Sequence, residues 1–131
     1  MSTSVPQNTY HYLDFNGALK KMGDLPALND LLEMLQVSLS RDIPRIQELL
    51  AQDDILLVNR ILHSLKGFIP IFCSEALCAE VASVEELSRT ASAAAVLTAY
   101  ASLGPKLQLL QQDVAQSLSE GGTLFETGST G

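Results

Sequence analysis

Several residue types that specialised binding sites need are scarce in this chain of 131 residues. It has no tryptophan, three tyrosines and four phenylalanines, which leaves little aromatic surface for stacking nucleic-acid bases. Eight lysines and arginines stand against fifteen acidic residues, a formal charge of −7, so no nucleic acid is expected as a partner. Two histidines and two cysteines are too few for a protein-built metal site, and none is predicted.

Long hydrophobic runs are also missing. Apolar residues make up 47% of the chain, yet no uninterrupted run approaches the roughly 18 residues of a membrane-spanning helix, so no membrane insertion is expected. The segment from Met1 to Tyr10 lacks the cationic start and apolar core of a secretory signal, which favours a cytoplasmic protein. In that compartment Cys73 and Cys78 are expected to be reduced thiols with a structural role.

What the chain has in abundance is helical periodicity. Apolar residues recur every three or four positions, the spacing that buries one face of a helix. Four long stripes follow this rule: Leu28 to Leu50, Ile55 to Phe72, Leu77 to Leu87, and Val96 to Leu118. A short helix from Phe15 to Met22, between the N-cap Asp14 and Gly23, is predicted to precede them. The fold class is therefore all-α, an antiparallel four-helix bundle with a short additional N-terminal helix.

Interruptions in these stripes set the expected boundaries. Residues 1–9 are predicted to be a flexible arm, 10–118 the helical bundle, and 119–131 a flexible glycine-rich tail. Pro44 and Gly104-Pro105 fall inside stripes that keep their phase, so each predicts a kink rather than a break. Pro70 removes a helical donor, and the second stripe is expected to bend or end between Phe68 and Cys73.

His63 is the candidate reactive residue. At 100° per residue it projects roughly 130° from the middle of its buried stripe, so it is predicted to be exposed. A solvated imidazole is largely neutral near pH 7 and keeps a nucleophilic lone pair, which can attack phosphorus. The alternative is a partly buried histidine bonded to a backbone carbonyl.

Two residues on the next turn fit a phosphoryl acceptor. Lys66 can steady the added negative charge, although a lysine here could equally be a solvated surface residue. Gly67 costs roughly 1 kcal/mol relative to alanine inside a helix, so it needs a compensating role. We expect it to leave room for a partner's approach to His63, with close helix packing as the alternative.

No catalytic set accompanies this histidine. His11 lies in the N-terminal segment and is interpreted as a packing or incidental residue. No nucleophilic triad is recognisable, and Gly121-Gly122 neither follows a strand nor opens a helix, so it is not a phosphate cradle. An enzyme with independent turnover is therefore not predicted.

The segment His63-Ser64-Leu65-Lys66-Gly67 resembles the signature of the histidine-containing phosphotransfer (HPt) domain family of bacterial two-component phosphorelays. The likeness covers Tyr12 to about Leu118 and includes the stretch from Ser74 to Leu87. It implies that His63 is the phosphoacceptor, Lys66 the phosphoryl-stabilising cation and Gly67 the clearing residue. The chain departs from the family after Gly67, where Phe68 to Cys73 replace the usual small residues.

The resemblance also implies the partners. A phosphoryl group would pass between aspartates of response-regulator receiver domains, with a hybrid sensor histidine kinase also expected. This chain would bind no cofactor, because Mg²⁺ is expected on the partner receiver domain. A monomer is expected, either free-standing or part of a hybrid kinase.

The other hypothesis is an HPt-fold docking module that regulates a signalling partner without carrying phosphate. Helix geometry assigns the docking surface to Leu56, Asn59, Arg60, Ser64 and Pro70, around Gly67.

Overall fold

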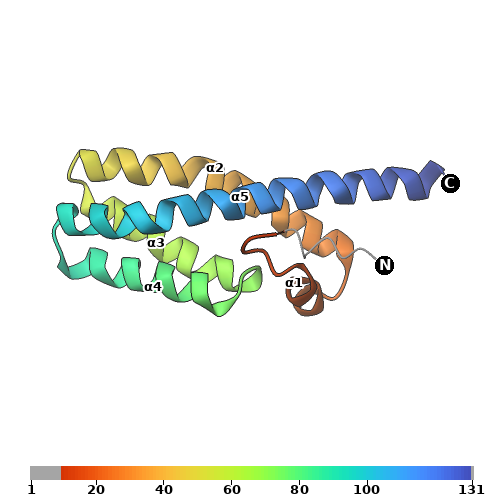
Figure 1. Cartoon of the computed structure of the whole chain (residues 1–131), viewed down its shortest axis with the longest axis horizontal. Helices are drawn as coiled ribbons and strands as arrows, with labels where there is room; N and C mark the ends of the chain where they lie inside the picture. The colour runs from red at the N-terminus through yellow and green to blue at the C-terminus, as the bar shows by residue number, and fades with distance from the viewer. Residues whose placement is uncertain (1–9, 131) are drawn as a thin grey trace.

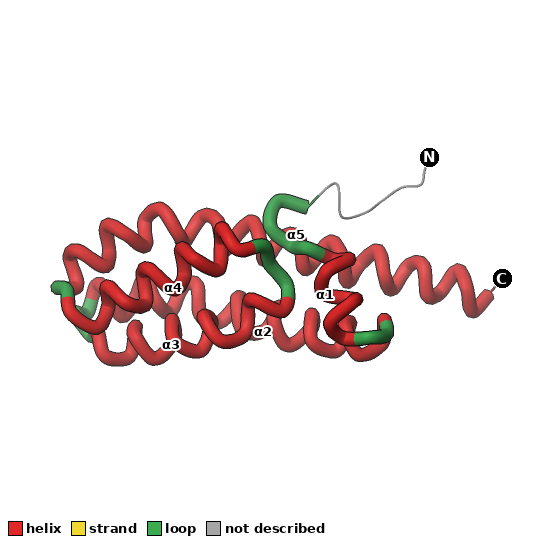
Figure 2. Tube along the Cα trace, turned by 90° about the horizontal axis from the view of Figure 1, so that it is seen from below, coloured by secondary structure: helices red, strands yellow, loops and turns green. Residues whose placement is uncertain are grey.

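Five α-helices and one 3₁₀ turn make up the computed structural model, which describes residues 10–130 and the side chains of residues 10–120. The elements are α1 (Phe15–Met22), α2 (Leu25–Ala51), α3 (Ile55–Phe68), η2 (Ile69–Ile71), α4 (Glu75–Thr90) and α5 (Ala93–Thr130). The long helices pack in a ring, because α2 and α4 each contact both α3 and α5 (Figure 1). The short helix α1 lies near one end, against α2 and η2 (Figure 2). The predicted all-α bundle with an extra N-terminal helix is confirmed.

The core consists of the apolar stripes that the sequence predicts. Buried side chains come from all four long helices and include Leu28, Leu32, Leu35, Leu39, Ile46, Val58, Leu62, Leu65, Leu77, Val81, Val96, Leu103, Leu107 and Val114. Burial of such aliphatic groups stabilises the fold by about 1.5–3 kcal/mol for each side chain. In the described part of the chain, no helix has the length and apolarity that crossing a bilayer requires.

Acidic caps fix where the first three helices begin. The carboxylates of Asp14, Asp24 and Asp54 accept hydrogen bonds from backbone N–H groups three residues later, at 3.1, 2.8 and 3.4 Å. The first helix ends at Gly23, whose φ of 92° lies in the left-handed region that glycine tolerates. These observations confirm the predicted ends of α1.

Later caps are less uniform. Ser92 accepts a hydrogen bond from the Ala95 N–H at 3.2 Å and so caps the start of α5. Ser74 stands at the N-cap of α4, but its side chain makes no capping hydrogen bond.

Proline has different effects in different helices. The helix α2 runs through Pro44, and α5 runs through Gly104 and Pro105, so each is one helix as predicted. The kinks at these prolines stay predictions. By contrast, α3 ends at Phe68 and gives way to the 3₁₀ turn that contains Pro70. The predicted end of the second stripe is confirmed, and the missing proline N–H provides the physical reason.

The two predicted tails have different outcomes. Residues 1–9 lie outside the described residues. The last helix continues to Thr130, so the end expected at Leu118 is wrong as a helix boundary. The predicted flexibility of residues 119–131 stays a prediction.

A single buried carboxylate ties the segment before α1 to the last helix. Asp113 on α5 is 1% exposed. Its Oδ2 atom accepts hydrogen bonds from the backbone N–H groups of His11, Tyr12 and Leu13 at 2.9, 2.7 and 3.2 Å. The His11 Nδ1 atom also lies 3.1 Å from an Asp113 oxygen. The His11 side chain is 53% exposed, so its contact with Asp113 lies at the surface of this junction.

The end of the bundle near η2 is held by α1 and the chain before it. The Lys21 ammonium donates to the Pro70 carbonyl at 2.7 Å, and the Asp14 N–H donates to the Phe72 carbonyl at 2.7 Å. Cys73, next to this turn, is buried, and Cys78 is partly buried; both are free thiols. Burial raises the pKa of each thiol above its usual value. Both cysteines therefore fit the structural role predicted for them.

Candidate functional site

His63 projects from the middle of α3 into solvent. Its side chain is 67% exposed, whereas its neighbours Leu62 and Leu65 are 0% and 2% exposed and face the core. The predicted exposure is therefore confirmed. A partly buried imidazole, the structural alternative, does not fit this position.

A buried carboxylate from α4 lies beneath the imidazole. Glu85 has a side chain that is only 1% exposed, and its Oε2 atom lies 3.5 Å from Nδ1 of His63. Its Oε1 atom lies 3.3 Å from the Lys66 ammonium, and Arg89 approaches Oε2 at 3.0 Å. We call these four residues the Glu85 cluster. The cluster joins the histidine and two cations across the α3–α4 contact.

Asn59, one turn before His63, holds this carboxylate in place. Its amide nitrogen donates to Ser88 Oγ at 2.8 Å and lies 3.2 Å from the Glu85 carbonyl and 3.3 Å from Glu85 Oε2. The Ser88 hydroxyl in turn donates to the Glu85 carbonyl at 2.6 Å. These contacts fix the backbone and the carboxylate of Glu85 together.

The charge state of Glu85 follows from its surroundings. Burial acts to raise the pKa of this carboxyl group, but hydrogen bonds and charge from Arg89 and Lys66 lower it, and the pKa falls below its usual value. Glu85 is therefore an anion at neutral pH. Since a carboxylate can only accept hydrogen bonds, it favours the imidazole tautomer that carries its proton on Nδ1. The lone pair then lies on Nε2, on the far side of the ring.

The two cations are not ordinary solvated surface groups. The Lys66 side chain is 39% exposed and Arg89 is 47% exposed, and each contacts Glu85 while keeping part of its surface open to solvent. With Glu85 ionised, they leave the cluster with one surplus positive charge when His63 is neutral. Such a site favours the addition of a negatively charged group near His63.

Gly67 lies one turn beyond His63 in open space. Apart from its chain neighbours and the adjacent backbone of α3, a Cβ atom built on Gly67 would meet no atom of the described residues within 4 Å. Close packing against another helix, the alternative weighed for this glycine, therefore has no support in the described residues. The free space lies on the exposed side of α3, close to the imidazole.

The residues nominated for docking do not share one environment. Leu56 is 62% exposed, and Arg60, Ser64 and Pro70 are also exposed on the surface. Asn59 is only partly exposed, because its amide binds Ser88 and Glu85. The structure thus places Asn59 inside the support of the Glu85 cluster, and the other four on the outer surface.

Sequence reasoning did not identify Glu85 or Arg89. A signal for Glu85 was present, since it lies four residues after Val81 on a buried face of α4, where a carboxylate needs a cationic or hydrogen-bonding partner. Nothing in the sequence, however, indicates that this partner comes from α3. The pairing with His63 depends on how α3 and α4 pack.

No metal site is apparent beside the histidine. The described residues contain no group of three or more His, Cys, Asp or Glu side chains that could hold a metal ion. What α3 and α4 assemble is an exposed imidazole whose Nδ1 lies 3.5 Å from a buried carboxylate, with two neighbouring cations and free space along the helix.

Comparison with known families agrees with this geometry. The Hpt domain family matches residues 30–120, which include α3, α4 and most of α2 and are more than half of the chain. Members of that family are phosphocarriers of phosphorelay signalling rather than independent enzymes. No curated protein and no solved structure matches the chain in the corresponding comparisons. On the family match, and with the bundle fold and exposed histidine in agreement, the chain belongs to the Hpt domain family.

Proposed function

We propose that this chain relays a phosphoryl group between receiver-domain aspartates through a phosphohistidine at His63. The observation that carries the proposal is the arrangement of the Glu85 cluster, in which His63 is 67% exposed and its Nδ1 faces a buried carboxylate. Nε2 of His63 is then the nucleophile. The partners are response-regulator receiver domains, with a hybrid sensor histidine kinase as the original phosphate source.

Transfer of the phosphoryl group from the receiver aspartate to His63 needs no further reactant. Nε2 attacks the phosphorus of an aspartyl phosphate, the N–P bond forms, the bond from phosphorus to the aspartyl oxygen breaks, and the aspartate leaves as a carboxylate. The positive charge that develops on the imidazole is stabilised by the Glu85 carboxylate, whose Oε2 lies 3.5 Å from Nδ1. Transfer to the next receiver reverses these events. The receiver domain is expected to supply Mg²⁺.

Lys66 and Gly67 have separate roles in this proposal. The new phosphoryl group carries about two negative charges, and the Lys66 ammonium can turn from Glu85 towards it. Arg89 can do the same, because it also contacts Glu85 and is 47% exposed. Gly67 leaves the space through which the receiver's aspartyl phosphate reaches Nε2. The chain thus contributes a positioned nucleophile and two cations.

The test is transfer from a receiver domain that carries radiolabelled phosphate. We expect wild type and His11→Gln to become labelled, and His63→Gln to remain unlabelled. His11→Gln is a matched control because the chain has only two histidines. The label should be stable in alkali and lost in acid, as for a phosphohistidine. Equal labelling of wild type and His63→Gln, or labelling of neither, would contradict the proposal. A docking module without phosphate transfer would bind the receiver and remain unlabelled.

A further inference from the structure

Asn59 joins α3 to α4 one turn before His63. Its side chain is half-buried and lies on the same flank of α3 as the imidazole, because residues four apart are neighbours on a helix. Asn59 contacts Ser88 while His63 faces Glu85, so the two helices meet through polar groups on successive turns. Asparagine is one of the less favourable residues inside a helix, and a half-buried amide needs hydrogen-bonding partners. An asparagine at this position therefore calls for an explanation.

The orientation of the Asn59 amide follows from the hydroxyl of Ser88. Ser88 Oγ lies 2.6 Å from the Glu85 carbonyl oxygen, which can only accept, so the single hydroxyl proton is donated there. The same Oγ atom must then accept from Asn59, which places the NH₂ group of the amide 2.8 Å from it. Ser88 is 4% exposed, so these bonds are shielded from water. The amide therefore has one orientation in this network.

This orientation directs a proton of the amide at Glu85. One NH₂ proton binds Ser88, and the other is shared between the Glu85 carbonyl at 3.2 Å and Glu85 Oε2 at 3.3 Å. Oε2 is also the oxygen that lies 3.5 Å from Nδ1 of His63. Asn59 thus contacts the same carboxylate oxygen that faces the imidazole, and it does so from the helix that carries the imidazole.

The two cations of the Glu85 cluster are less constant partners of that oxygen. Lys66 and Arg89 are 39% and 47% exposed, and in the proposed function they turn towards the phosphoryl group, which weakens their contacts with Glu85. Asn59 is neutral, so a phosphoryl group attracts it far less, and Ser88 holds its amide in place. The amide therefore keeps Oε2 beside the imidazole when the cations move.

We infer that Asn59 is a positioning residue for phosphoryl transfer. It holds Oε2 of Glu85 opposite Nδ1 of His63, so that the neutral imidazole keeps its proton on Nδ1 and its lone pair on Nε2. Asn59 contacts neither the phosphoryl group nor the receiver, and it acts only through Glu85. This inference rests on the proposed function and differs from the docking role that helix geometry assigns to Asn59.

The alternative is an amide that only joins the two helices. Loss of Asn59 would then lower the stability of the contact between α3 and α4 and leave the imidazole of His63 unchanged. Measurements on the imidazole itself separate the two roles.

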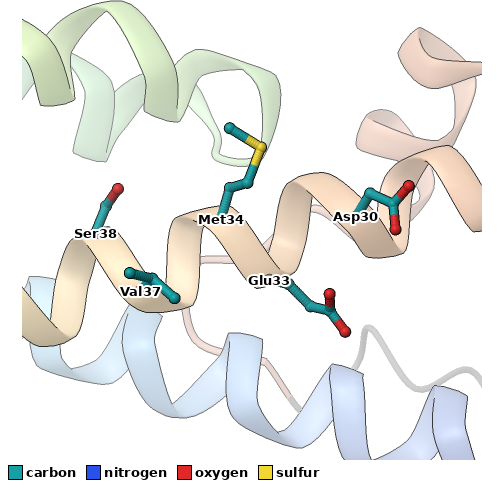
Figure 3. Close-up of a pocket in the computed structure, with 5 residues that line it drawn as sticks. All are labelled: Asp30, Glu33, Met34, Val37 and Ser38. Atoms are coloured by element: carbon teal, nitrogen blue, oxygen red, sulfur yellow. The ribbon is translucent and has the colours of Figure 1, made fainter.

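Two variants, each with a matched control, test the inference. Asn59→Leu removes the amide and keeps a side chain of similar volume, and Gln108→Leu, which removes an exposed amide from α5, is its control. Ser88→Ala leaves the Asn59 amide present but free to turn. Its control is Ser38→Ala on α2, a helix that contributes no residue to the Glu85 cluster; Figure 3 shows Ser38 at a surface hollow. Thermal unfolding establishes that each variant is folded.

The first measurement is the rate at which His63 is labelled by phosphoramidate, a small-molecule phosphodonor that needs no receiver. Asn59→Leu should be labelled about tenfold more slowly than wild type, and Ser88→Ala about threefold more slowly, because Oε2 is no longer held beside Nδ1. Both control variants should stay within about twofold of wild type. Equal rates for wild type and Asn59→Leu would overturn the inference.

The second measurement is the tautomer of His63, read from nitrogen NMR shifts of the imidazole. Spectra are recorded at alkaline pH, where imidazoles are neutral, on chains that carry His11→Gln so that one histidine remains. The parent chain should carry the proton mainly on Nδ1, and Asn59→Leu should shift the population towards the Nε2–H tautomer. A purely structural amide would not change this signal in a folded chain. The same tautomer in both chains would contradict the positioning role.

A double variant tests whether Asn59 acts through Glu85. In a chain that carries Glu85→Gln, adding Asn59→Leu should slow labelling by less than about twofold, because the carboxylate that the amide positions has gone. If the effects of the two substitutions multiply, Asn59 acts by another route and the inference is wrong.

Failure of this inference can be told apart from failure of the proposed function. If wild type is labelled neither by phosphoramidate nor by any receiver, the proposed function fails. Normal labelling of both wild type and Asn59→Leu removes the inference alone. Binding of a receiver to a His63→Gln chain should be the same with and without Asn59→Leu. Weaker binding together with normal phosphoramidate labelling would make Asn59 a docking residue and overturn the inference.

Discussion

Oε2 of Glu85 on α4 lies 3.5 Å from Nδ1 of His63 on α3, and the carboxylate is buried while the imidazole is exposed. The proposed phosphoacceptor on α3 thus has its carboxylate neighbour on a different helix. Glu85 also contacts Lys66 and Arg89, so one buried carboxylate lies next to the imidazole and to two cations. Changes on α4 should therefore alter chemistry on α3.

Replacing Glu85 by glutamine should make folding stability less dependent on acid pH. The folded pKa of Glu85 is lowered, so its contribution is present above the unfolded value near 4.5 and is lost as pH falls through the folded value. Glu85→Gln should cost about 1 kcal/mol at pH 7, the scale for bonds between a carboxylate and partly exposed cations. Urea denaturation at several pH values measures this difference.

That difference should shrink towards zero as the pH is lowered below 4.5. Glu86→Gln is the matched control, because Glu86 is the adjacent acid and its side chain is 70% exposed. A difference for Glu85→Gln that stays constant down to pH 3 would show that the charge of Glu85 does not matter for stability.

Gly67→Ala should stabilise the protein and slow phosphate transfer. Because a Cβ at this position meets nothing within 4 Å, the folded state accepts alanine, and the helix gains about 0.5–1 kcal/mol. The added methyl group lies on the approach to His63, so transfer from a phosphorylated receiver should slow about tenfold. The rate at which phosphoramidate, a small-molecule phosphodonor, labels Gly67→Ala should be close to the rate for wild type. Unchanged transfer from the receiver would refute the access role of Gly67.

Asp113→Ala should release the segment before α1 from α5. The substitution leaves the N–H groups of His11, Tyr12 and Leu13 without their acceptor, which should lower the free energy of unfolding by about 3 kcal/mol. Asp113→Asn keeps one acceptor oxygen, so its free energy of unfolding should fall by roughly half as much. Asp30→Ala, at an exposed acid of α2, is the control.

Hydrogen exchange supplies a second measure of the Asp113 contacts. In Asp113→Ala the amide protons of residues 11–13 should exchange much faster, while those in the core of α2 change little. Unchanged protection of residues 11–13 would mean that Asp113 does not hold this segment.

Tyr10 should make the fold sensitive to alkali. Burial raises the pKa of its hydroxyl from 10.0 to about 12, and the hydroxyl donates to Glu120 at 2.9 Å. The unfolded chain releases this proton first, so stability should fall as pH rises from 10 to about 12. The stability of Tyr10→Phe, measured by thermal unfolding, should fall less steeply over this pH range. Tyr12→Phe serves as the control. Equal slopes for wild type and Tyr10→Phe would contradict the assignment.

The helices and their buried faces could be predicted from the sequence because they depend on local spacing. Leucine stripes such as Leu28 to Leu39 identify a helix and its core side whatever packs against it. The end of α3 was equally predictable, since Pro70 lacks a donor N–H wherever it stands. His63 was found for the same reason, as a polar residue opposite a buried stripe.

The contacts of Glu85 and Asp113 could not be predicted, because they join residues that are far apart in the chain. Glu85 reaches His63 only because α3 and α4 pack side by side, and Asp113 reaches residues 11–13 only because the N-terminal segment folds back onto α5. The helical course of α5 beyond Leu118 was missed for another reason, because the glycine-rich composition there predicts a loop.

Asp113 also affects which substitutions the N-terminal junction can accept. It recognises three consecutive main-chain N–H groups, in the way that a backbone anion site recognises a phosphate or sulfate ion. The bound anion here is a side chain of the protein itself. The main-chain hydrogen bonds therefore place no demand on the identities of the side chains at positions 11–13, provided that none is proline, whereas position 113 needs a short carboxylate. The main-chain attachment of residues 11–13 to α5 thus depends on one side chain of the last helix.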